Sequence, residues 1–438
     1  MIESRRKAII VILTFAGICV YLLGLFVGPR VSQTEIDNNG LWLLNVTVSK
    51  HFGVSLNKDS FFYMDVAKDP ASVFEEKNIV QARPLLPFLA HFPSRLLEAG
   101  VLGPRFGSAG KASANYFVGP YLAFIIINSM ALWFSYLLYA RILSRNVVEA
   151  EDSESTLFAS TAFVCGCLLI VNDLTKAFFF AAHTQMLGIL TPLIALAVSQ
   201  RLLSQKLDFK DVAFYSFAAG LGALAYGSFF VVGGAIVIVL LYRFAVKKDI
   251  PISRFIAGLI LTLLSLLLPY GVWVILVKTL TGGFYNHEIA RWHQVVWMLE
   301  VVDKGIIWLA SRLVDNFLFF SKSMLYYASQ FAVVALVLLY FSVSVWNPLW
   351  IKIKADIEFL TWPLAVALLF LLFFTLVGYQ EKRLAFPSVV MVIVVLGHWA
   401  MRLELILPKR RQRQLLVSTW IVISVYGAAT VMKNGPFY

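Results

Sequence analysis

Charged residues are scarce in this sequence. Only 14% of the 438 residues are Asp, Glu, Lys or Arg, whereas 60% are hydrophobic. Soluble domains carry about 25% charged residues, and the apolar residues here form many runs of about 20, the length that crosses a bilayer. The composition excludes an ordinary soluble protein and predicts a polytopic membrane protein.

Several signatures of chemistry are also missing. The three cysteines (Cys19, Cys165 and Cys167) all lie in apolar segments, which gives neither a disulfide framework nor a metal-binding pair. The sequence has no glycine-rich phosphate loop and no Gly-x-Ser-x-Gly unit. The cytoplasmic segments that we predict are too short for a nucleotide-binding unit, so chemistry driven by bound ATP is not indicated.

The net charge of +12 does not form a single patch. Basic residues recur in short clusters between apolar runs, as the positive-inside rule expects, and this pattern argues against nucleic-acid binding. The basic start at Arg5, Arg6 and Lys7 precedes an apolar run too long for an ordinary signal peptide, so we expect a retained first helix.

The apolar runs predict an all-α polytopic fold of about eleven membrane spans in a single domain over residues 1–438. The first span, 8–28, precedes a long extracytoplasmic loop, 29–115; residues 116–280 hold six spans, and a second extracytoplasmic loop, 281–323, precedes four more in 324–438. The expected spans are 8–28, 116–140, 156–172, 179–199, 212–226, 229–244, 255–280, 324–346, 358–378, 384–403 and 414–432.

The apolar segment 84–101 decides the topology. It carries His91, Arg95 and Glu98 together with three prolines, which favours a helix lying at the membrane interface. If it crossed, the basic clusters at residues 141–145, 201–210, 243–254, 352–354 and 409–413 would all move outside, against the positive-inside rule. We therefore predict a non-crossing segment, a cytoplasmic N-terminus, and both long loops on the extracytoplasmic face.

The first loop contains candidate catalytic acids. If residues 58–68 are helical, Asp59 and Tyr63 share one face at i,i+4 spacing, with Asp65 nearby. A carboxylate just above the membrane, beside apolar Phe61 and Phe62, is suited to accept a proton from an acceptor hydroxyl. The alternative is an ordinary acidic surface loop.

Two cationic segments are candidates for binding phosphate. Arg83 leads an Arg-Pro-Leu-Leu-Pro stretch and either pairs with a carboxylate or phosphate or simply reaches out of the membrane. Glu381, Lys382 and Arg383 lie between two apolar helices at headgroup depth, where they suit a lipid phosphate or form a solvated turn.

The second loop carries His287, Arg291 and His293 among aromatic residues. Cations and aromatics at a membrane interface suit a lid over a lipid or sugar, and equally a structural anchor. The two histidines are six residues apart, not the i,i+4 of a helical zinc pair, so we expect no zinc site here.

The order of these motifs resembles that of the GT-C superfamily of membrane glycosyltransferases. Asp59-x-x-x-Tyr63 in the first outer loop is followed by Arg-Pro-Leu-Leu-Pro at 83–87, which resembles the corresponding region of mannosyltransferases that use GPI or polyprenol substrates. Late in the chain, Gln380-Glu-Lys-Arg-Leu-Ala-Phe-Pro387 resembles their Glu-x-Arg-Phe motif. The similar topology covers most of the chain, and the motifs about forty residues of it.

The resemblance implies a mechanism and its residues. A hexose would pass from a polyprenyl-phosphate donor to a lipid-linked, glycan or protein hydroxyl on the extracytoplasmic face. Asp59 would be the base, with Asp65 in reserve; Asp37 stands alone where some branches carry paired acids. Arg383 and Lys382 would hold the donor phosphate, with Arg291 as an alternative. Arginine–phosphate contacts can replace a metal, although a divalent cation (Mg²⁺ or Mn²⁺) stays an open alternative.

Two other classes of function compete with this interpretation. A polysaccharide polymerase or ligase using undecaprenyl-diphosphate glycans also has about a dozen spans, and loop 281–323 is compatible with one. A lipid or sugar transporter would carry charges within its spans and related halves, and neither pattern is evident. We expect a bacterial inner-membrane enzyme that contacts membrane lipids and no nucleic acid.

Overall fold

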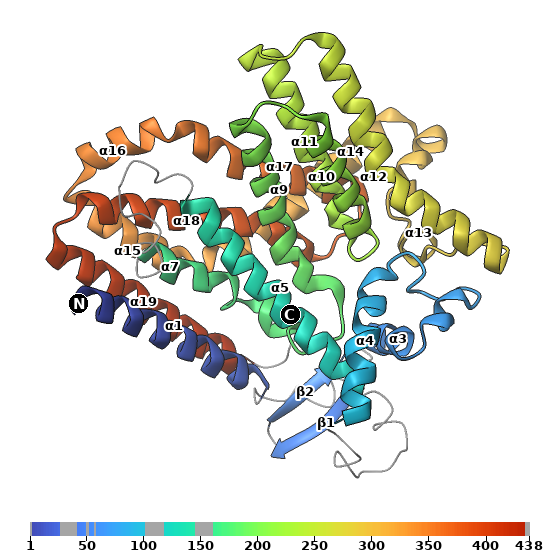
Figure 1. Cartoon of the computed structure of the whole chain (residues 1–438), viewed down its shortest axis with the longest axis horizontal. Helices are drawn as coiled ribbons and strands as arrows, with labels where there is room; N and C mark the ends of the chain where they lie inside the picture. The colour runs from blue at the N-terminus through green and yellow to red at the C-terminus, as the bar shows by residue number, and fades with distance from the viewer. Residues whose placement is uncertain are drawn as a thin grey trace.

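The structure is a computed structural model, and it describes residues 2–26, 42–49, 52–56, 58–100, 118–144 and 161–433. Most of these residues are helical, as predicted (Figure 1). The first long loop adds one antiparallel hairpin, β1 (Trp42–Ser49) with β2 (Phe52–Leu56). Its valines, Thr47 and aromatic residues favour extended backbone. The predicted all-α polytopic fold is confirmed, with this small sheet as an addition.

Seven helical segments in the described part of the chain are long and apolar enough to span a membrane. An eighth results if α14 (Val301–Ser329) and α15 (Ala332–Val343), which meet at a 63° bend, count together. The chain is therefore an integral, multi-pass membrane protein. The seven contain α5 (Val118–Ser144), α9 (Leu187–Ser204), α11 (Phe230–Tyr242), α12 (Ile252–Thr281), α17 (Ile357–Val377), α18 (Phe386–Ile406) and α19 (Lys409–Met432).

Three of the expected spans are not among these seven candidate spans. The first lies on α1 (Ile2–Phe26), and residues 212–226 overlap α10 (Phe209–Ala223), which has 15 residues. Of residues 156–172 the structure describes 161–172, and these contain the six-residue α7 (Thr161–Gly166) rather than a continuous helix. Asn172 bonds back to the carbonyls of Leu168 and Leu169 and caps the short α8 (Asp173–Phe178). The figure of about eleven spans stays a prediction.

The helical bundle has two ends that differ in their loops and charges. At one end, which we call the loop end, the first loop meets the rest of the chain: Leu85 N–H donates to Leu224 O, and Trp273 Nε1 donates to Gln81 O. The opposite, basic end holds the ion pairs Arg243–Asp249 and Lys247–Glu358 and the bonds of Glu404 to Thr161. Figure 1 shows α3 (Lys58–Lys68) and α4 (Leu85–Gly100) beyond the ends of α5 and α12, at the loop end.

Helix α4 covers most of segment 84–101 and is not among the candidate spans. Its 16 residues contain Pro93 and carry two apolar stripes. Leu86 and Ala90 are buried against the protein, whereas Leu89, Phe92 and Leu96 are exposed. An exposed apolar stripe on a short helix at the end of a membrane bundle is typical of a helix lying in the interface.

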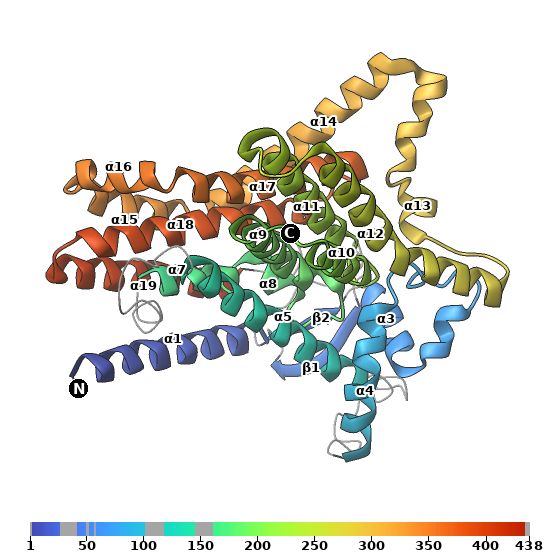
Figure 2. The same ribbon diagram turned by 45° about the horizontal axis from the view of Figure 1, so that its top comes forward.

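Residues 282–300 form an arm over the loop end. Helix α12 ends at Gly282, and α13 (His287–Trp292) precedes α14 (Figure 2). The arm returns to the bundle where Val295 N–H donates to Val377 O and Trp297 Nε1 donates to Leu376 O. Gly378 has a φ of 76° and would place a Cβ 2.1 Å from Trp297 Nε1, so only glycine fits this contact.

Candidate functional site

The site begins on α3, which forms over residues 58–68 as the sequence predicts. Asp59 lies in its first turn and is exposed, which suits a carboxylate at the positive end of a helix dipole. One turn later Tyr63 is buried, and its ring centroid lies 5.6 Å from that of His183 and 6.3 Å from that of Phe124. Helix α3 thus presents an acid at the surface and a phenol beneath it.

Arg83 is fixed between α12 and α13 by its neighbour Gln81. The Gln81 carbonyl accepts from Trp273 Nε1 at 2.7 Å, and its Oε1 accepts from Tyr285 N–H at 2.9 Å. The Arg83 guanidinium then donates to Glu288 Oε1 on α13. Burial opposes the charge, but Glu288 and Tyr63 raise the pKa of Arg83 above its usual value, so the side chain stays cationic.

Two buried polar rings adjoin Arg83. His183 caps a short turn, and its Nδ1 accepts from Gln185 N–H at 3.3 Å. Tyr226, between α10 and α11, donates its hydroxyl to Gln185 Oε1 at 3.3 Å. Burial, Arg383 and Arg83 lower the pKa of His183 well below its usual value, which leaves the imidazole neutral. Burial raises the pKa of Tyr226 to about 12, although both arginines lower it.

Arg383 approaches the same rings from the late part of the chain. After Gly378 ends α17, the turn η8 (Lys382–Ala385) leads into α18, where Pro387 is favoured in the first turn. This turn places Arg383 Cζ 5.1 Å from the Phe178 ring centroid, and the Phe178 ring also packs against His183. Among the described residues, Arg383 Nε is buried with no hydrogen-bond partner, and no acidic side chain pairs with Arg383.

The rim of the site brings together side chains from both loops and from the α17–α18 turn. The Trp292 and Tyr379 ring centroids are 5.0 Å apart, and Arg291 lies 5.0 Å from the Trp292 ring. Burial raises the pKa of Tyr379, and the charges that also act on it are Glu381, Arg383, Asp59 and Arg291. Asp59 and Arg383 therefore both lie near Tyr379, on the same side of the molecule.

Four other predicted site residues lie further from this centre. Asp65 is on another face of α3, where burial and Asp69 raise its pKa and Lys68 lowers it. Lys382 is exposed, with Nζ 5.9 Å from the Tyr326 ring. His287 Nδ1 lies 3.2 Å from the Tyr285 hydroxyl, and His293 is exposed at the end of α13. Asp37 lies outside the described residues.

Sequence reasoning did not assign a site role to Glu288, His183, Gln185 or Tyr226. An isolated histidine in an apolar stretch gave no reason to choose His183. Glu288 is 205 residues from Arg83 in sequence, and that pairing depends on how the arm folds back. Tyr226 and Gln185 lie in the short turns that precede α11 and α9. A break between two apolar runs is the feature of the sequence that could have indicated these residues.

The arrangement can bind an anion beside a carboxylate. The half-buried guanidinium groups of Arg83 and Arg383 act on the same histidine and tyrosine, and of the two only Arg83 has an acidic partner among the described residues. A buried cation without a counter-ion is costly unless a ligand supplies one. In the same residues, no group of three or more His, Cys, Asp or Glu side chains could hold a metal ion.

Comparison of the sequence with protein-family models and with curated proteins finds no match. The structure is similar to the crystal structure of ArnT from Cupriavidus metallidurans bound to undecaprenyl phosphate, with a TM-score of 0.50 and 13% sequence identity. The likeness covers 94% of this chain and 63% of ArnT, so the chain matches less than two thirds of that protein's length. It confirms the expected type of fold: this chain has an ArnT-like polytopic membrane fold.

Proposed function

We propose that this protein is a membrane glycosyltransferase that transfers a hexose from a polyprenyl-phosphate donor to an acceptor hydroxyl. The observation that carries the proposal is Arg383, a half-buried cation that has no acidic partner in the described residues and whose Nε is buried without a hydrogen-bond partner. Arg383 acts on the same histidine and tyrosine as Arg83. Arginine is well suited to bind phosphate because its planar guanidinium donates two parallel hydrogen bonds.

In the proposed reaction, the acceptor oxygen attacks the anomeric carbon of the sugar and the lipid phosphate departs. Arg383 and Arg83 stabilise the negative charge that grows on the departing phosphate. Asp59, at the exposed start of α3, accepts the acceptor's proton. Neutral His183, whose Nδ1 accepts from Gln185 N–H, can donate a hydrogen bond from Nε2 without adding charge to the pocket.

The fold supports a long-chain lipid donor. The ArnT crystal structure contains undecaprenyl phosphate, and we extend that lipid class to this chain by analogy of fold. The acceptor is a lipid-linked, glycan or protein hydroxyl. Basic residues crowd the end opposite the site, so the positive-inside rule favours an extracytoplasmic active site in a bacterial inner membrane.

Replacement of Asp59 tests the proposed base. Asp59→Asn in membranes should reduce transfer from a polyprenyl-phosphate hexose by about 10²–10⁴-fold, the usual contribution of general base catalysis. Asp65→Asn is the matched control, because it removes a carboxylate from another face of the same helix. Full activity of Asp59→Asn, with loss in Asp65→Asn, would assign the role to Asp65.

A polymerase or ligase that uses undecaprenyl-diphosphate glycans is the second candidate. It is favoured by Arg291, a third cation carried to the rim by the arm. A diphosphate carries more negative charge than a monophosphate and would engage this additional arginine. Turnover of a lipid-diphosphate glycan, with none of a lipid-monophosphate sugar, would select this candidate.

A further inference from the structure

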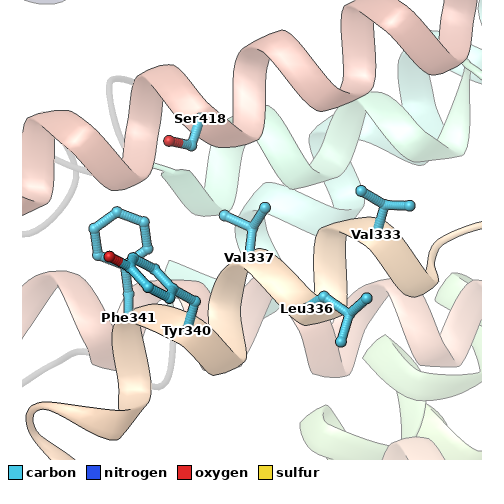
Figure 3. A pocket seen from close by; sticks show the side chains of 6 residues that line it. All are labelled: Val333, Leu336, Val337, Tyr340, Phe341 and Ser418. Carbon is cyan, nitrogen blue, oxygen red and sulfur yellow. The ribbon is translucent and has the colours of Figure 1, made fainter.

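A shallow groove runs between α15 and α19, away from the candidate site. It has a volume of about 280 Å³ and is lined by Val333, Leu336, Val337, Tyr340 and Phe341 of α15 and Ser418 of α19. In Figure 3, Val333 and Val337 point from α15 toward the helix that carries Ser418. Apart from Ser418 and the Tyr340 hydroxyl, the lining offers only apolar surface, which suits a hydrocarbon chain.

The groove leads toward a polar cluster at the loop end. Gln330 immediately precedes the α14–α15 bend, and its Nε2 donates to Asp173 Oδ2 at 2.8 Å. The Tyr426 hydroxyl, two helical turns along α19 from Ser418, donates to Gln330 Oε1 at 2.8 Å. Both helices that form the groove are thus tied to Asp173.

Two lysines complete this cluster. Lys433 Nζ donates to Asp173 Oδ2 at 2.7 Å, and Lys176 Nζ donates to the Lys433 carbonyl. Lys433 alone is bonded to the carboxylate, Lys176 lies beside it, and each ammonium group retains N–H donors that no described residue uses. Burial and Lys433 lower the pKa of Lys176 to about 8, although Asp173 raises it. An anion bound here would remove the excess positive charge.

The spacing fits a phospholipid in one leaflet. Val333 to Phe341 is eight residues, or about 12 Å at about 1.5 Å per helical residue. Half of a hydrocarbon core about 30 Å thick is about 15 Å, so a chain in the groove would place its phosphate near the level of Gln330. Lys176 and Lys433 lie at that level.

We propose that the α15–α19 groove and the Asp173–Lys176–Lys433 cluster form a binding site for an anionic phospholipid, separate from the candidate catalytic site. One acyl chain occupies the groove, and the phosphate accepts hydrogen bonds from Lys176 and Lys433. The net charge of the cluster, +1 with both lysines protonated, matches the single negative charge of a phosphatidylglycerol headgroup.

Native mass spectrometry of the full-length, delipidated protein tests this site. The probe is palmitoyl-oleoyl phosphatidylglycerol, compared with the zwitterionic phosphatidylcholine that has the same chains. We expect the wild type to retain phosphatidylglycerol about tenfold better, and Lys176→Gln/Lys433→Gln to lose this preference. Lys322→Gln removes an exposed lysine of α14 outside the cluster; it is the single-lysine control and should keep the preference.

A second variant guards against a folding defect. Val337→Trp fills the groove from a position in contact with lipid and should reduce retention of both lipids, with unchanged monodispersity and thermal stability. Equal retention of the two lipids by the wild type, or an unchanged preference in the double lysine variant, would overturn the proposal. Because the readout is lipid binding, its result does not depend on whether the protein transfers sugar.

Discussion

Arg383 at the loop end differs from two arginines at the basic end in how its charge is compensated. At the basic end, Arg402 forms a bidentate ion pair with Asp356, and His398 Nε2 lies 3.0 Å from the same carboxylate. Arg243 pairs with Asp249 and also donates to the carbonyls of Leu202 and Gln205. At the loop end, Arg383 is packed against Phe178 with no acidic partner in the described residues.

Under the proposed function, the paired arginines Arg243 and Arg402 stabilise the fold, whereas the unpaired Arg383 binds the phosphate of the donor. A paired arginine whose donors are satisfied stabilises its surroundings, and its loss leaves a buried carboxylate uncompensated. An arginine without a counter-ion costs free energy in the empty protein and regains it when an anion binds. The two classes of arginine should therefore respond to mutation in opposite ways.

The largest expected effect is on catalysis at the loop end. Arg383→Gln should reduce sugar transfer by about 10²–10³-fold, as for removal of one preorganised donor to a developing charge. Thermal stability should be unchanged or higher, because the variant removes an uncompensated, half-buried charge. Steady-state transfer assays and thermal unfolding of the same detergent preparation measure both quantities. A large loss of stability would place Arg383 among the structural charges.

The converse is expected at the basic end. Arg402→Gln leaves Asp356 without its bidentate partner, and breaking such a buried pair typically costs about 3–5 kcal/mol. The melting temperature should fall by several degrees, while kcat per folded molecule should match that of the wild type. Asp356→Asn/Arg402→Gln is the control, since removing both charges should restore part of the lost stability.

A smaller effect is expected for the tyrosine between the two arginines. Tyr226→Phe deletes the hydroxyl that bonds to Gln185 and leaves the ring in place. One hydrogen bond contributes about 0.5–1.5 kcal/mol, or up to about tenfold in binding. The expected result is a KM for the lipid donor raised about tenfold with kcat nearly unchanged. Tyr136→Phe is the control, because that hydroxyl bonds to Phe163 O, remote from the site.

The smallest effect concerns pH. The folded protein keeps His183 neutral at pH values where the unfolded chain protonates it, near 6.5. The unfolded state then binds more protons, so the free energy of unfolding should decrease as pH falls below about 6.5. His183→Gln should show a shallower decrease in melting temperature between pH 7 and pH 5. Parallel curves for the two proteins would contradict the assignment of a neutral, buried histidine.

The same contrast explains what could be predicted from the sequence. Apolar runs predicted the membrane fold, because that fold depends on local composition. The distribution of Lys and Arg predicts that α4 does not cross the membrane, which stays a prediction. Motif order selected Asp59, Arg83 and Arg383. The pairing of Arg83 with Glu288 depends on the arm folding back through the Trp297–Gly378 contact, and no local pattern contains that information.

The break in the helix within residues 161–172 has a similarly specific cause. Their apolar character predicted a span, but the Asn172 side chain uses its donors and acceptor to end one helix and begin another. Asp65 was named as the reserve base because it lies close to Asp59 in the sequence. Six residues along an α-helix correspond to a rotation of about 600°, so Asp65 lies on a different face of α3 from Asp59.

Affinity for undecaprenyl phosphate tests the central claim most directly. Binding to the purified, full-length protein should weaken at least 30-fold in Arg383→Gln and stay within about twofold of wild type in Arg402→Gln, since about 2 kcal/mol of a charged contact with phosphate is lost only at the loop end. Equal affinities in wild type and Arg383→Gln would contradict the assignment of this unpaired arginine to the donor phosphate.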